Sequence, residues 1–387
     1  MVKSSRPLPV VLAGARGHGR RHLENIGRLE AAGLLRLAGI CELAPLTAEE
    51  LAGFGAPAQS ADFGGLLDST GAGLAVICTP IQTHTDLALA AARRGVHLLL
   101  EKPPAPSYAE FQRMADGVRA AGTACQIGFQ SLGSHALPAI RELIDSGSIG
   151  TVRGIGGAGA WVRDEGYYRR APWAGRRRLG DLDVVDGVLT NPLAHAVATA
   201  FALDGSSLAD DVSSIETELF RAHDIEADDT SCVRAVTGRG TRVTVAATLC
   251  AEEQAEPYLV VHGDRGRITF WYKQDRVLVQ RAGSGPAESV HGRTDLLENL
   301  VEHLAGRAEL LAPPQETGAF MRVVEAIRTA PEPAPLPAGS WRSAAGESGS
   351  RRIVRGIGGL VAASADTLSL FSELGAPWAL PSEVSTS

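Results

Sequence analysis

The chain has 387 residues, 44% of them hydrophobic and 21% charged, so it can bury a full core and divide into two domains. A formal net charge of −7 argues against a nucleic acid or a membrane surface as partner, since either would call for a basic face. The five cysteines form no CxxC pair, so we expect no metal site, no disulfide framework and a reduced, cytoplasmic setting. No apolar run is long enough for a membrane span, and the short run near the N-terminus leads into glycines, unlike a signal peptide.

The first predicted unit is a strand, a glycine-rich turn and a helix. Residues 10–13 are a short apolar run, and a helical pattern leads on to Gly33. The turn between them lets backbone N–H groups and the helix N-terminus face a pyrophosphate. The spacing departs from GxGxxG because Arg16 stands at the middle glycine, where its side chain must point away or lie along the phosphates. A plain strand-to-helix turn is the alternative. The residues expected to contact the cofactor here are Gly14, Arg16, Gly17, His18 and Gly19.

The second predicted strand, residues 36–41, ends at Glu42. A carboxylate at this place can accept hydrogen bonds from the adenosine ribose hydroxyls, and its charge would repel a 2′-phosphate. We therefore expect NAD(H) rather than NADP(H). Two alternatives stay open: Arg20 and Arg21 are close enough in sequence to meet a 2′-phosphate, and Glu42 could be an exposed or helix-capping residue.

Further strand and helix units follow at regular spacing. Apolar strands are predicted at 74–78, 96–100 and 123–127, with helices at 83–94 and 107–121 between them. This alternation predicts a doubly wound parallel sheet, whose carboxyl edge gathers the residues that follow its strands. A solvated lysine at a strand end is the alternative for Lys102. The residues expected near the cofactor at this edge are Thr79, Pro80, His84, Glu101 and Lys102.

The second half of the chain is β-rich. Short, partly alternating segments bounded by Gly, Asp or Pro predict one large open sheet, and its uncovered face predicts a homo-oligomer, a dimer or tetramer. These segments are residues 151–162, 213–221, 230–236, 242–250, 258–262, 267–272 and 276–280.

An unusual loop, residues 161–187, follows the first of these strands. Its aromatic residues offer flat faces of the kind that stack on sugar rings, and its arginines offer donors to hydroxyls or an anion. An exposed loop anchored by aromatics is the alternative. The residues predicted to contact substrate here are Trp161, Tyr168, Arg169 and Trp173, with Tyr167, Arg170 and Arg176 beside them.

Several of these motifs together resemble the Gfo/Idh/MocA oxidoreductases. They are the turn at 14–19, Glu42, Thr79-Pro80 with His84, the triplet Glu101-Lys102-Pro103, and residues 128–150. The resemblance implies a Rossmann domain followed by a domain with a large, mostly antiparallel sheet. It also implies oxidation or reduction of sugars, cyclitols or related polyols with a nicotinamide cofactor.

In this family a helix carries an Asp and, four residues later, a His, both beside the Glu-Lys-Pro lysine. The matching residues here are Asn191 and His195, on a helix expected to open at 186–195 and run to Leu203. Residues four apart share a helix face, so both are predicted to bind substrate and serve catalysis with Lys102. A core histidine is the alternative for His195, and the change from Asp to Asn is the main departure from the family.

These observations predict an enzyme with three segments. Residues 1–130 form the Rossmann domain and 131–330 the substrate-binding and oligomerisation domain; helical patterns at 296–328 pack back beside the Rossmann domain. Residues 331–387 form a Pro/Gly/Ser-rich linker at 331–350 and a tail that docks through apolar residues on the body or on a neighbouring subunit. The tail glycines at 356–359 lack a strand and helix context for a second nucleotide loop.

The predicted reaction moves a hydride between NAD(H) and a hydroxyl-bearing carbon of a sugar, cyclitol or polyol, while Lys102 and His195 manage the hydroxyl proton. Two alternatives are a redox-neutral elimination or epimerisation with tightly held NAD, and a catalytically inactive nucleotide-binding or sensory protein.

Overall fold

The computed structural model describes residues 7–380, which divide into two compact units. The first unit contains the chain up to Gly133 together with Thr294–Pro314, and the second contains Ser134–Arg293 and the chain from Gln315 onward. The chain therefore returns to the first unit for one short segment, which overlaps the residues 296–328 that were expected to pack beside the Rossmann domain. Within residues 7–380, no helix combines the length and the apolar character that crossing a membrane requires.

The first unit is built on a six-stranded parallel sheet of order β3-β2-β1-β4-β5-β6, which confirms the predicted doubly wound fold. Four of its strands read as near-continuous apolar runs because both faces of such a sheet are covered by helices. The strands are β1 (Leu8–Ala13), β2 (Leu35–Cys41), β3 (Ala58–Ser60), β4 (Leu74–Ile77), β5 (His97–Leu100) and β6 (Cys125–Ile127).

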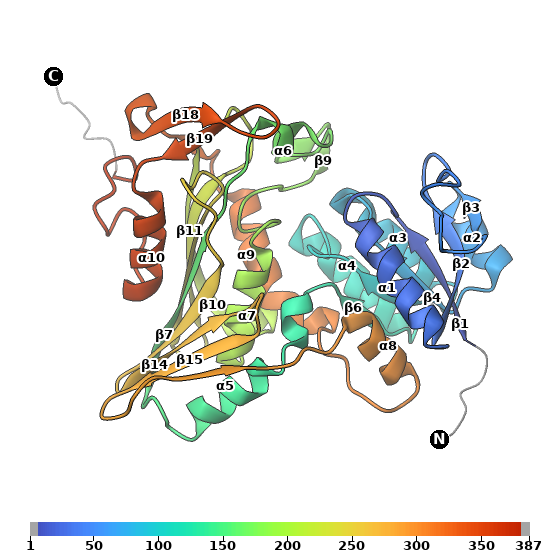
Figure 1. The fold of residues 1–387 in the computed structure, drawn as a ribbon, viewed down its shortest axis with the longest axis horizontal. Coiled ribbons are helices and arrows are strands. Elements are labelled where there is room, and N and C mark those ends of the chain that lie inside the picture. Colours follow the sequence, from blue (N-terminus) through green and yellow to red (C-terminus); the bar gives the residue numbers. More distant parts are fainter. Residues whose placement is uncertain (1–6, 381–387) are drawn as a thin grey trace. The chain divides into compact units, whose positions relative to one another are not determined.

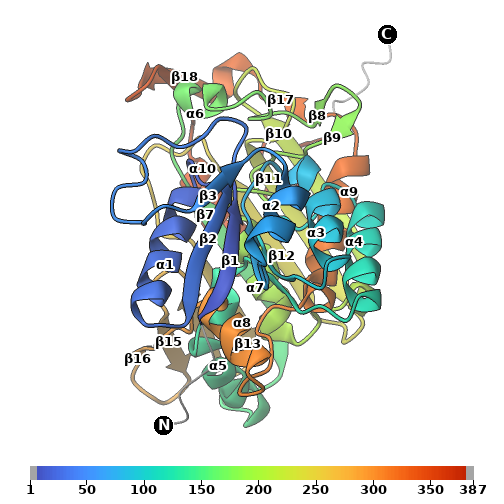
Figure 2. The ribbon, with the colours of Figure 1, turned by 90° about the vertical axis from the view of Figure 1, so that its right-hand side faces the viewer.

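Five helices cover this sheet. In Figure 2, α1 lies on one side of β1 and β2, and α2, α3 and α4 follow one another on the other side. Asn25 of α1 donates to the Asp295 carboxylate at the start of α8 at 3.0 Å, which explains why Thr294–Pro314 belongs to this unit. The helices are α1 (Gly19–Ala31), α2 (Phe63–Thr70), α3 (His84–Ala92), α4 (Tyr108–Ala120) and α8 (Leu296–Leu304).

The second unit contains a nine-stranded sheet of order β16-β15-β14-β13-β7-β12-β11-β10-β17 (Figure 1), which confirms the predicted large sheet. It is mostly antiparallel; β7 runs parallel to β12, and β10 parallel to β17. Its strands are β7 (Val152–Ala160), β10 (Val212–Arg221), β11 (Thr230–Thr237), β12 (Arg242–Thr248), β13 (Tyr258–Gly263), β14 (Gly266–Trp271), β15 (Arg276–Arg281), β16 (Ala287–Val290) and β17 (Ala334–Pro335). The remaining elements are α5 (Ala136–Asp145), α6 (Glu165–Arg169), β8 (Arg178–Leu179), β9 (Leu182–Asp183), α7 (Ala194–Asp204), α9 (Gly318–Thr329), β18 (Trp341–Ala345), β19 (Ser350–Val354) and α10 (Ile357–Thr367).

The glycine-rich sequence of β7 allows helices to pack closely on both faces of this sheet. A Cβ atom on Gly156 would lie 1.9 Å from the carbonyl oxygen of Ala365 in α10. On the opposite face, a Cβ atom on Gly159 would lie 2.5 Å from the side chain of Leu193, just before α7. Because successive strand residues alternate between faces, the run GIGGAGA serves both helices.

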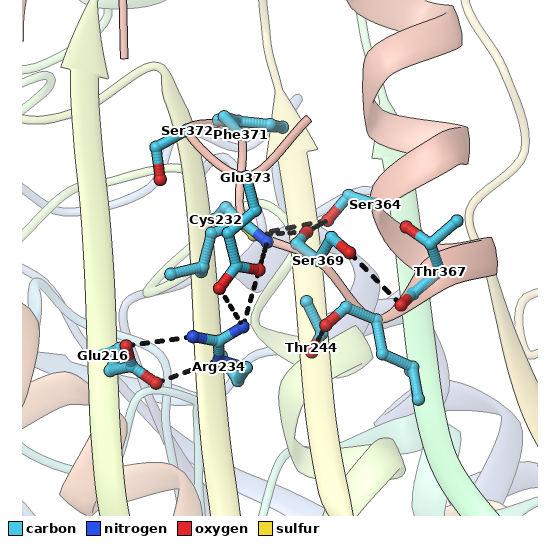
Figure 3. A network of polar contacts seen from close by, with 12 residues as sticks. Glu216, Cys232, Arg234, Thr244, Ser364, Thr367, Ser369, Phe371, Ser372 and Glu373 are labelled. Atoms are coloured by element: carbon cyan, nitrogen blue, oxygen red, sulfur yellow. Dashed lines mark hydrogen bonds and ion pairs between the residues drawn. The ribbon is translucent and has the colours of Figure 1, made fainter. Parts of the chain in front are cut away.

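The tail differs from the predicted linker. Residues 331–350 contribute β17, β18 and the start of β19, and β18 and β19 pair as an antiparallel hairpin. The following apolar residues pack on the sheet of their own chain: Phe371 is fully buried, and its ring lies 5.4 Å from that of Trp378. Figure 3 shows the polar part of this contact, where Arg234 of β11 binds Glu216 at 2.9 Å and Glu373 of the tail at 2.7 Å.

This tail covers part of the sheet face on which a second copy was expected. Helix α10 packs against β7 and β12, and the buried residues around Phe371 extend the cover towards β10 (Figure 1). This part of the sheet is therefore not an uncovered face on which a second copy could pack. A homo-oligomer stays a prediction.

A strand and a helix do flank the tail glycines, which differs from the sequence analysis. Strand β19 is followed by Gly356, with φ at 69°, and then by α10. However, β19 belongs to a hairpin rather than to a parallel sheet, and Glu252, Glu253 and Glu256 line the cavity at this end of α10. Three carboxylates would repel a phosphate, so these glycines still do not form a nucleotide loop.

Candidate functional site

The glycine-rich turn packs tightly on the carboxyl ends of the neighbouring strands. Gly14 has φ at 80°, and a Cβ atom there would lie 2.4 Å from the carbonyl oxygen of Cys78. A Cβ atom on Gly19 would lie 1.8 Å from the carbonyl oxygen of Gly14. Gly17, with φ at 58°, faces open space within this turn. The turn therefore requires glycine at its two ends for packing and leaves space around its middle.

Glu42 ties this turn to the end of β2. Its Oε1 atom accepts hydrogen bonds from the backbone N–H groups of Ala15 at 2.6 Å and Arg16 at 3.2 Å. Its Oε2 atom lies 3.8 Å from the Arg16 guanidinium. One carboxylate oxygen thus holds the turn, and the charge of the other stays at the end of β2.

Arg16 and Arg20 are held by the segment that follows β2. Arg16 Nε donates to Glu50 at 2.8 Å, and this hydrogen bond lowers the pKa of Glu50 to about 2. Arg20 donates to the main-chain carbonyl of Glu50 at 2.6 Å and lies over the Phe54 ring. The Arg16 side chain therefore points toward residues 44–50.

His84 joins the ends of β4 and β5. Its Nδ1 atom lies 2.9 Å from the carbonyl oxygen of Pro103, and its Nε2 atom lies 2.8 Å from that of Thr79. Burial lowers the pKa of His84, although both carbonyls and Glu101 oppose this effect. A neutral ring can donate to only one of the two carbonyls. Thr79, Pro80 and His84 thus lie together at the predicted edge, with Pro103 beside them.

Glu101 is a buried anchor beneath the glycine-rich turn. Its Oε1 atom lies 2.8 Å from Nε2 of His22 and accepts from Gln130 at 3.0 Å, while Oε2 accepts the backbone N–H of Lys102 at 3.1 Å. Burial alone would raise the pKa of Glu101, but hydrogen bonds from His18 and His22 lower it well below its usual range. Glu101 is only 4% exposed, and its hydrogen bonds hold the carboxylate in place. It therefore fixes the backbone of Lys102.

Sequence analysis missed His22 and Gln130 as part of this anchor. His22 is buried on α1, one helical turn after His18, and their rings meet edge to face at 5.6 Å. A polar residue on the otherwise apolar face of α1 was the available signal. The Lys102-Pro103 peptide bond is cis.

In the second unit, Asn191 lies in a turn before α7 rather than on the helix. The helix begins at Ala194, so the prediction of a helix opening at 186–195 is wrong, and the shared-face argument does not apply to Asn191. Pro192 explains the difference, because it has no N–H group and disfavours a helical conformation in the residue before it. His195 is the second residue of α7.

Asp186 stands beside Asn191 and was not predicted from the sequence. Its Oδ1 atom accepts from Asn191 Nδ2 at 2.6 Å, and Oδ2 accepts from the Gly175 N–H at 2.7 Å and from Arg170 at 3.2 Å. Burial raises the pKa of Asp186, while Arg170 and these hydrogen bonds oppose the rise. A buried carboxylate is thus present next to the position where the family has Asp and this chain has Asn.

The aromatic loop brings together only part of the predicted substrate set. Arg170 lies between Tyr167 and Trp173, at 3.7 and 4.6 Å from their ring centres, and so places both aromatics beside Asp186. Arg169 instead points to the tail, where it donates to the Ser348 carbonyl at 2.8 Å. Tyr168 and Arg169 line a cavity of about 940 Å³, and Trp161 stacks with Arg163 and Lys273.

Two sequence models match this chain. Residues 8–129 match the "Oxidoreductase family, NAD-binding Rossmann fold" and residues 138–269 match the "GFO/IDH/MocA C-terminal domain". The chain belongs to the Gfo/Idh/MocA family. The first unit is the NAD-binding Rossmann domain of this family, which confirms the predicted cofactor, and the second unit contains its C-terminal domain.

Similar curated proteins are dehydrogenases, matched over short segments. The chain is 33% identical over 85 residues to scyllo-inositol 2-dehydrogenase (NAD(+)) of Bacillus subtilis, covering 22% of this chain and 25% of that protein. It is 28% identical over 145 residues to levoglucosan dehydrogenase of Pseudarthrobacter phenanthrenivorans, covering 35% and 37%. The matches thus span well under half of these relatives.

Solved dehydrogenase structures share the fold over most of the chain. The WlbA dehydrogenase of Bordetella pertussis, in complex with NADH and UDP-GlcNAcA, superposes with a TM-score of 0.68 at 22% identity, covering 83% of this chain and 95% of that one. Levoglucosan dehydrogenase with NADH and levoglucosan superposes with a TM-score of 0.69 at 20% identity, covering 83% and 96%.

Proposed function

We propose that this protein is an NAD-dependent dehydrogenase or reductase that acts on a CH–OH group of a sugar, cyclitol or related polyol. Family membership and the names of the inositol and levoglucosan dehydrogenases support this class of substrate. One observation carries the proposal. Lys102 follows β5 at the carboxyl edge of the sheet, where open α/β sheets bind ligands, and buried Glu101 fixes its backbone beneath the glycine-rich turn.

The residues of the first unit fit NAD. The turn at 14–19 would hold the pyrophosphate on its N–H groups, and Thr79 and Pro80 would lie along the cofactor at the end of β4. The Oε2 side of Glu42 would accept the adenosine ribose hydroxyls. Arg16 lies near two carboxylates, those of Glu42 and Glu50, and their negative charge opposes a 2′-phosphate. This arrangement favours NAD(H) over NADP(H).

Lys102 and His195 are the proposed proton-handling groups. As an alcohol becomes a ketone, its carbon loses a hydride and its oxygen loses a proton, and bound NAD supplies the acceptor for the hydride. In the first unit, the Lys102 amine hydrogen-bonds the substrate oxygen and takes its proton. In the second unit, the imidazole of His195 is proposed as a further acid or base. The reverse reaction returns both.

Asn191 and Asp186 would set the electrostatics around His195. Asn191 Nδ2 donates to Asp186, and the amide oxygen of Asn191 can only accept, from an N–H or a hydroxyl. The charge of Asp186 is paired with that of Arg170. It would therefore stabilise an imidazolium at His195 more weakly than a carboxylate in direct contact with the ring.

The test is a substrate screen with the purified full-length protein. Inositols, anhydrosugars, hexoses and sugar acids are incubated with NAD, and the absorbance of reduced nicotinamide is followed. We expect reduction with at least one polyol and none with its fully deoxygenated analogue. Firm NAD binding without any reduction across the panel would contradict the proposal.

A further inference from the structure

The cavity of about 940 Å³ in the second unit carries an excess of positive charge. Its lining residues come from α6, the following loop with β8 and β9, the turn between β10 and β11, the end of α9, and β19. Seven arginines and five acidic residues line it, a formal excess of two positive charges. Its volume is at the upper end of the range of about 300–1,000 Å³ that is usual for small-molecule sites.

Four of these arginines are neutralised by carboxylates of the cavity itself. They are Arg169 with Glu165, Arg176 with Glu226, and Arg178 and Arg328 with Asp183. In the part of the chain that the structure describes, the other three form no ion pair and donate to main-chain carbonyls. Arg177 is used structurally, because it binds the carbonyls at the C-terminal end of α9, including that of Ile327 at 3.0 Å.

Arg221 and Arg352 leave parts of their guanidinium forks for a ligand. Arg221 donates through Nη1 to the Ile225 carbonyl at 2.7 Å and through Nε to the Pro333 carbonyl at 3.3 Å. Arg352 donates through Nη1 to the Ala222 carbonyl. The backbone thus engages two of the three guanidinium nitrogens of Arg221 and one of the three of Arg352. Among residues 7–380, Nη2 has no hydrogen-bond partner in either side chain.

Both arginines are held in place before any ligand binds. The Arg352 guanidinium stacks on the Trp341 ring at 4.2 Å, and its backbone N–H donates to His223 at 3.3 Å. Arg221 closes the β10–β11 turn through Ile225. Side chains restrained in this way lose little rotamer freedom on binding, which favours affinity.

We propose that this cavity binds a small molecule bearing a carboxylate or phosphate group, which Arg221 and Arg352 receive. A planar guanidinium fork matches the oxygens of either group, and a guanidinium stays charged at all physiological pH values. This site goes beyond the proposed function, since Arg221 and Arg352 have no assigned part in hydride transfer, although Tyr168 and Arg169 of its lining were expected to contact substrate. One of its wall residues, Gly175, donates to Asp186, which connects the cavity to the Asn191 amide.

Calorimetric titration tests the site without turnover. The full-length protein, with NAD present so that the glycine-rich turn does not take up phosphate, is titrated with glucose 6-phosphate, glucuronate and neutral glucose. We expect saturable binding of one or both anions and none of glucose. The phosphate and carboxylate arms identify which group the site prefers.

Variants locate the binding in the cavity. Arg352→Gln should lower the affinity for the anion about tenfold or more, since a charge-assisted hydrogen bond is lost. Glu332→Gln removes a negative charge from the lining and should raise the affinity for the anion about threefold. Arg267→Gln, on the exposed part of β14 away from the cavity, is the matched control and should change nothing.

The proposal stays testable even if one cavity variant does not fold. If Arg352→Gln fails to fold, Arg352→Lys, which keeps the charge but loses the fork, and Glu332→Gln still report on the same site. Absence of saturable anion binding, equal binding of glucose, or unchanged affinity in both cavity variants would overturn the proposal.

Discussion

His84 shows how one buried side chain sets conditions at the edge that carries Lys102. The ring bridges the carbonyls of Thr79 and Pro103, at the ends of neighbouring strands. In the neutral state one of these carbonyls lacks an N–H donor, and in the charged state the ring carries an unneutralised charge into the core. Burial decides the balance and lowers the pKa.

A pH-dependent stability follows for His84. Because its pKa is lower in the folded than in the unfolded chain, the folded state binds the proton less tightly, so the stabilisation is present above the unfolded pKa and is lost as the pH falls through the folded pKa. Urea unfolding of wild type and His84→Gln, from about pH 8 to about pH 5, should show a difference that shrinks on acidification. A difference that grows on acidification would mean that the imidazolium forms both hydrogen bonds.

The Asp186–Asn191 pair changes what an Asn191→Asp substitution should do. Restoring the residue of the family would place a second carboxylate within hydrogen-bond distance of Asp186, and the two would share a proton. We expect the pH profile of turnover to shift in Asn191→Asp, and the shift to disappear in the double variant with Asp186→Asn. Asn191→Ala is the control for loss of the amide. Superimposable profiles in all variants would remove both residues from the chemistry.

We expect cofactor preference to depend on Glu42 at the end of β2, Glu50 in the segment after it, and Arg16 in the glycine-rich turn. Glu42→Gln keeps an acceptor for the N–H groups of the turn but removes the charge, so it should narrow the preference for NAD over NADP by about tenfold. Glu50→Gln should narrow it further by freeing Arg16 for a 2′-phosphate. Fluorescence titration with both reduced cofactors measures this. Tighter binding of NADP(H) by wild type would contradict the assignment.

At the scale of elements, close packing of α10 on β7 holds the tail. Gly156→Ala places a methyl group against the Ala365 carbonyl and should cost about 1–3 kcal/mol, because the helix must shift. Gly359→Ala is the matched control within α10, where a Cβ atom meets nothing, and should stabilise by about 0.5–1 kcal/mol. Thermal unfolding compares them. Equal effects would show that α10 does not rest on β7 in solution.

Most elements of the first unit were predictable because each one is specified locally, but β3 and α2 were not predicted. Apolar runs of strand length, the capping residue Ser107 and the glycines at 14–19 define a parallel sheet without reference to distant residues. The tail was not predictable, because its Pro, Gly and Ser content resembles a linker. Only the contact of residues such as Phe371 with a sheet formed more than a hundred residues earlier orders it.

The same distinction holds for the candidate site. Lys102, Glu42 and the residues of the turn follow from their places after strands. Asp186 could not be predicted, because its buried environment forms only when the loop brings Arg170 and Gly175 against it. Arg221 and Arg352 come together only because the tail hairpin returns beside the β10–β11 turn.

At the scale of the whole molecule, the central claim is hydride transfer from a polyol carbon to NAD with Lys102 taking the proton. The direct measurement uses the active polyol deuterated at the reacting carbon, with mass analysis of the nicotinamide product in wild type and in Lys102→Ala. We predict that wild type forms reduced cofactor carrying the deuterium, and that Lys102→Ala forms it at least about a hundredfold more slowly while still binding NAD. Unlabelled reduced cofactor, deuterium returned to the sugar product with no net reduction, or an unimpaired Lys102→Ala variant would contradict it.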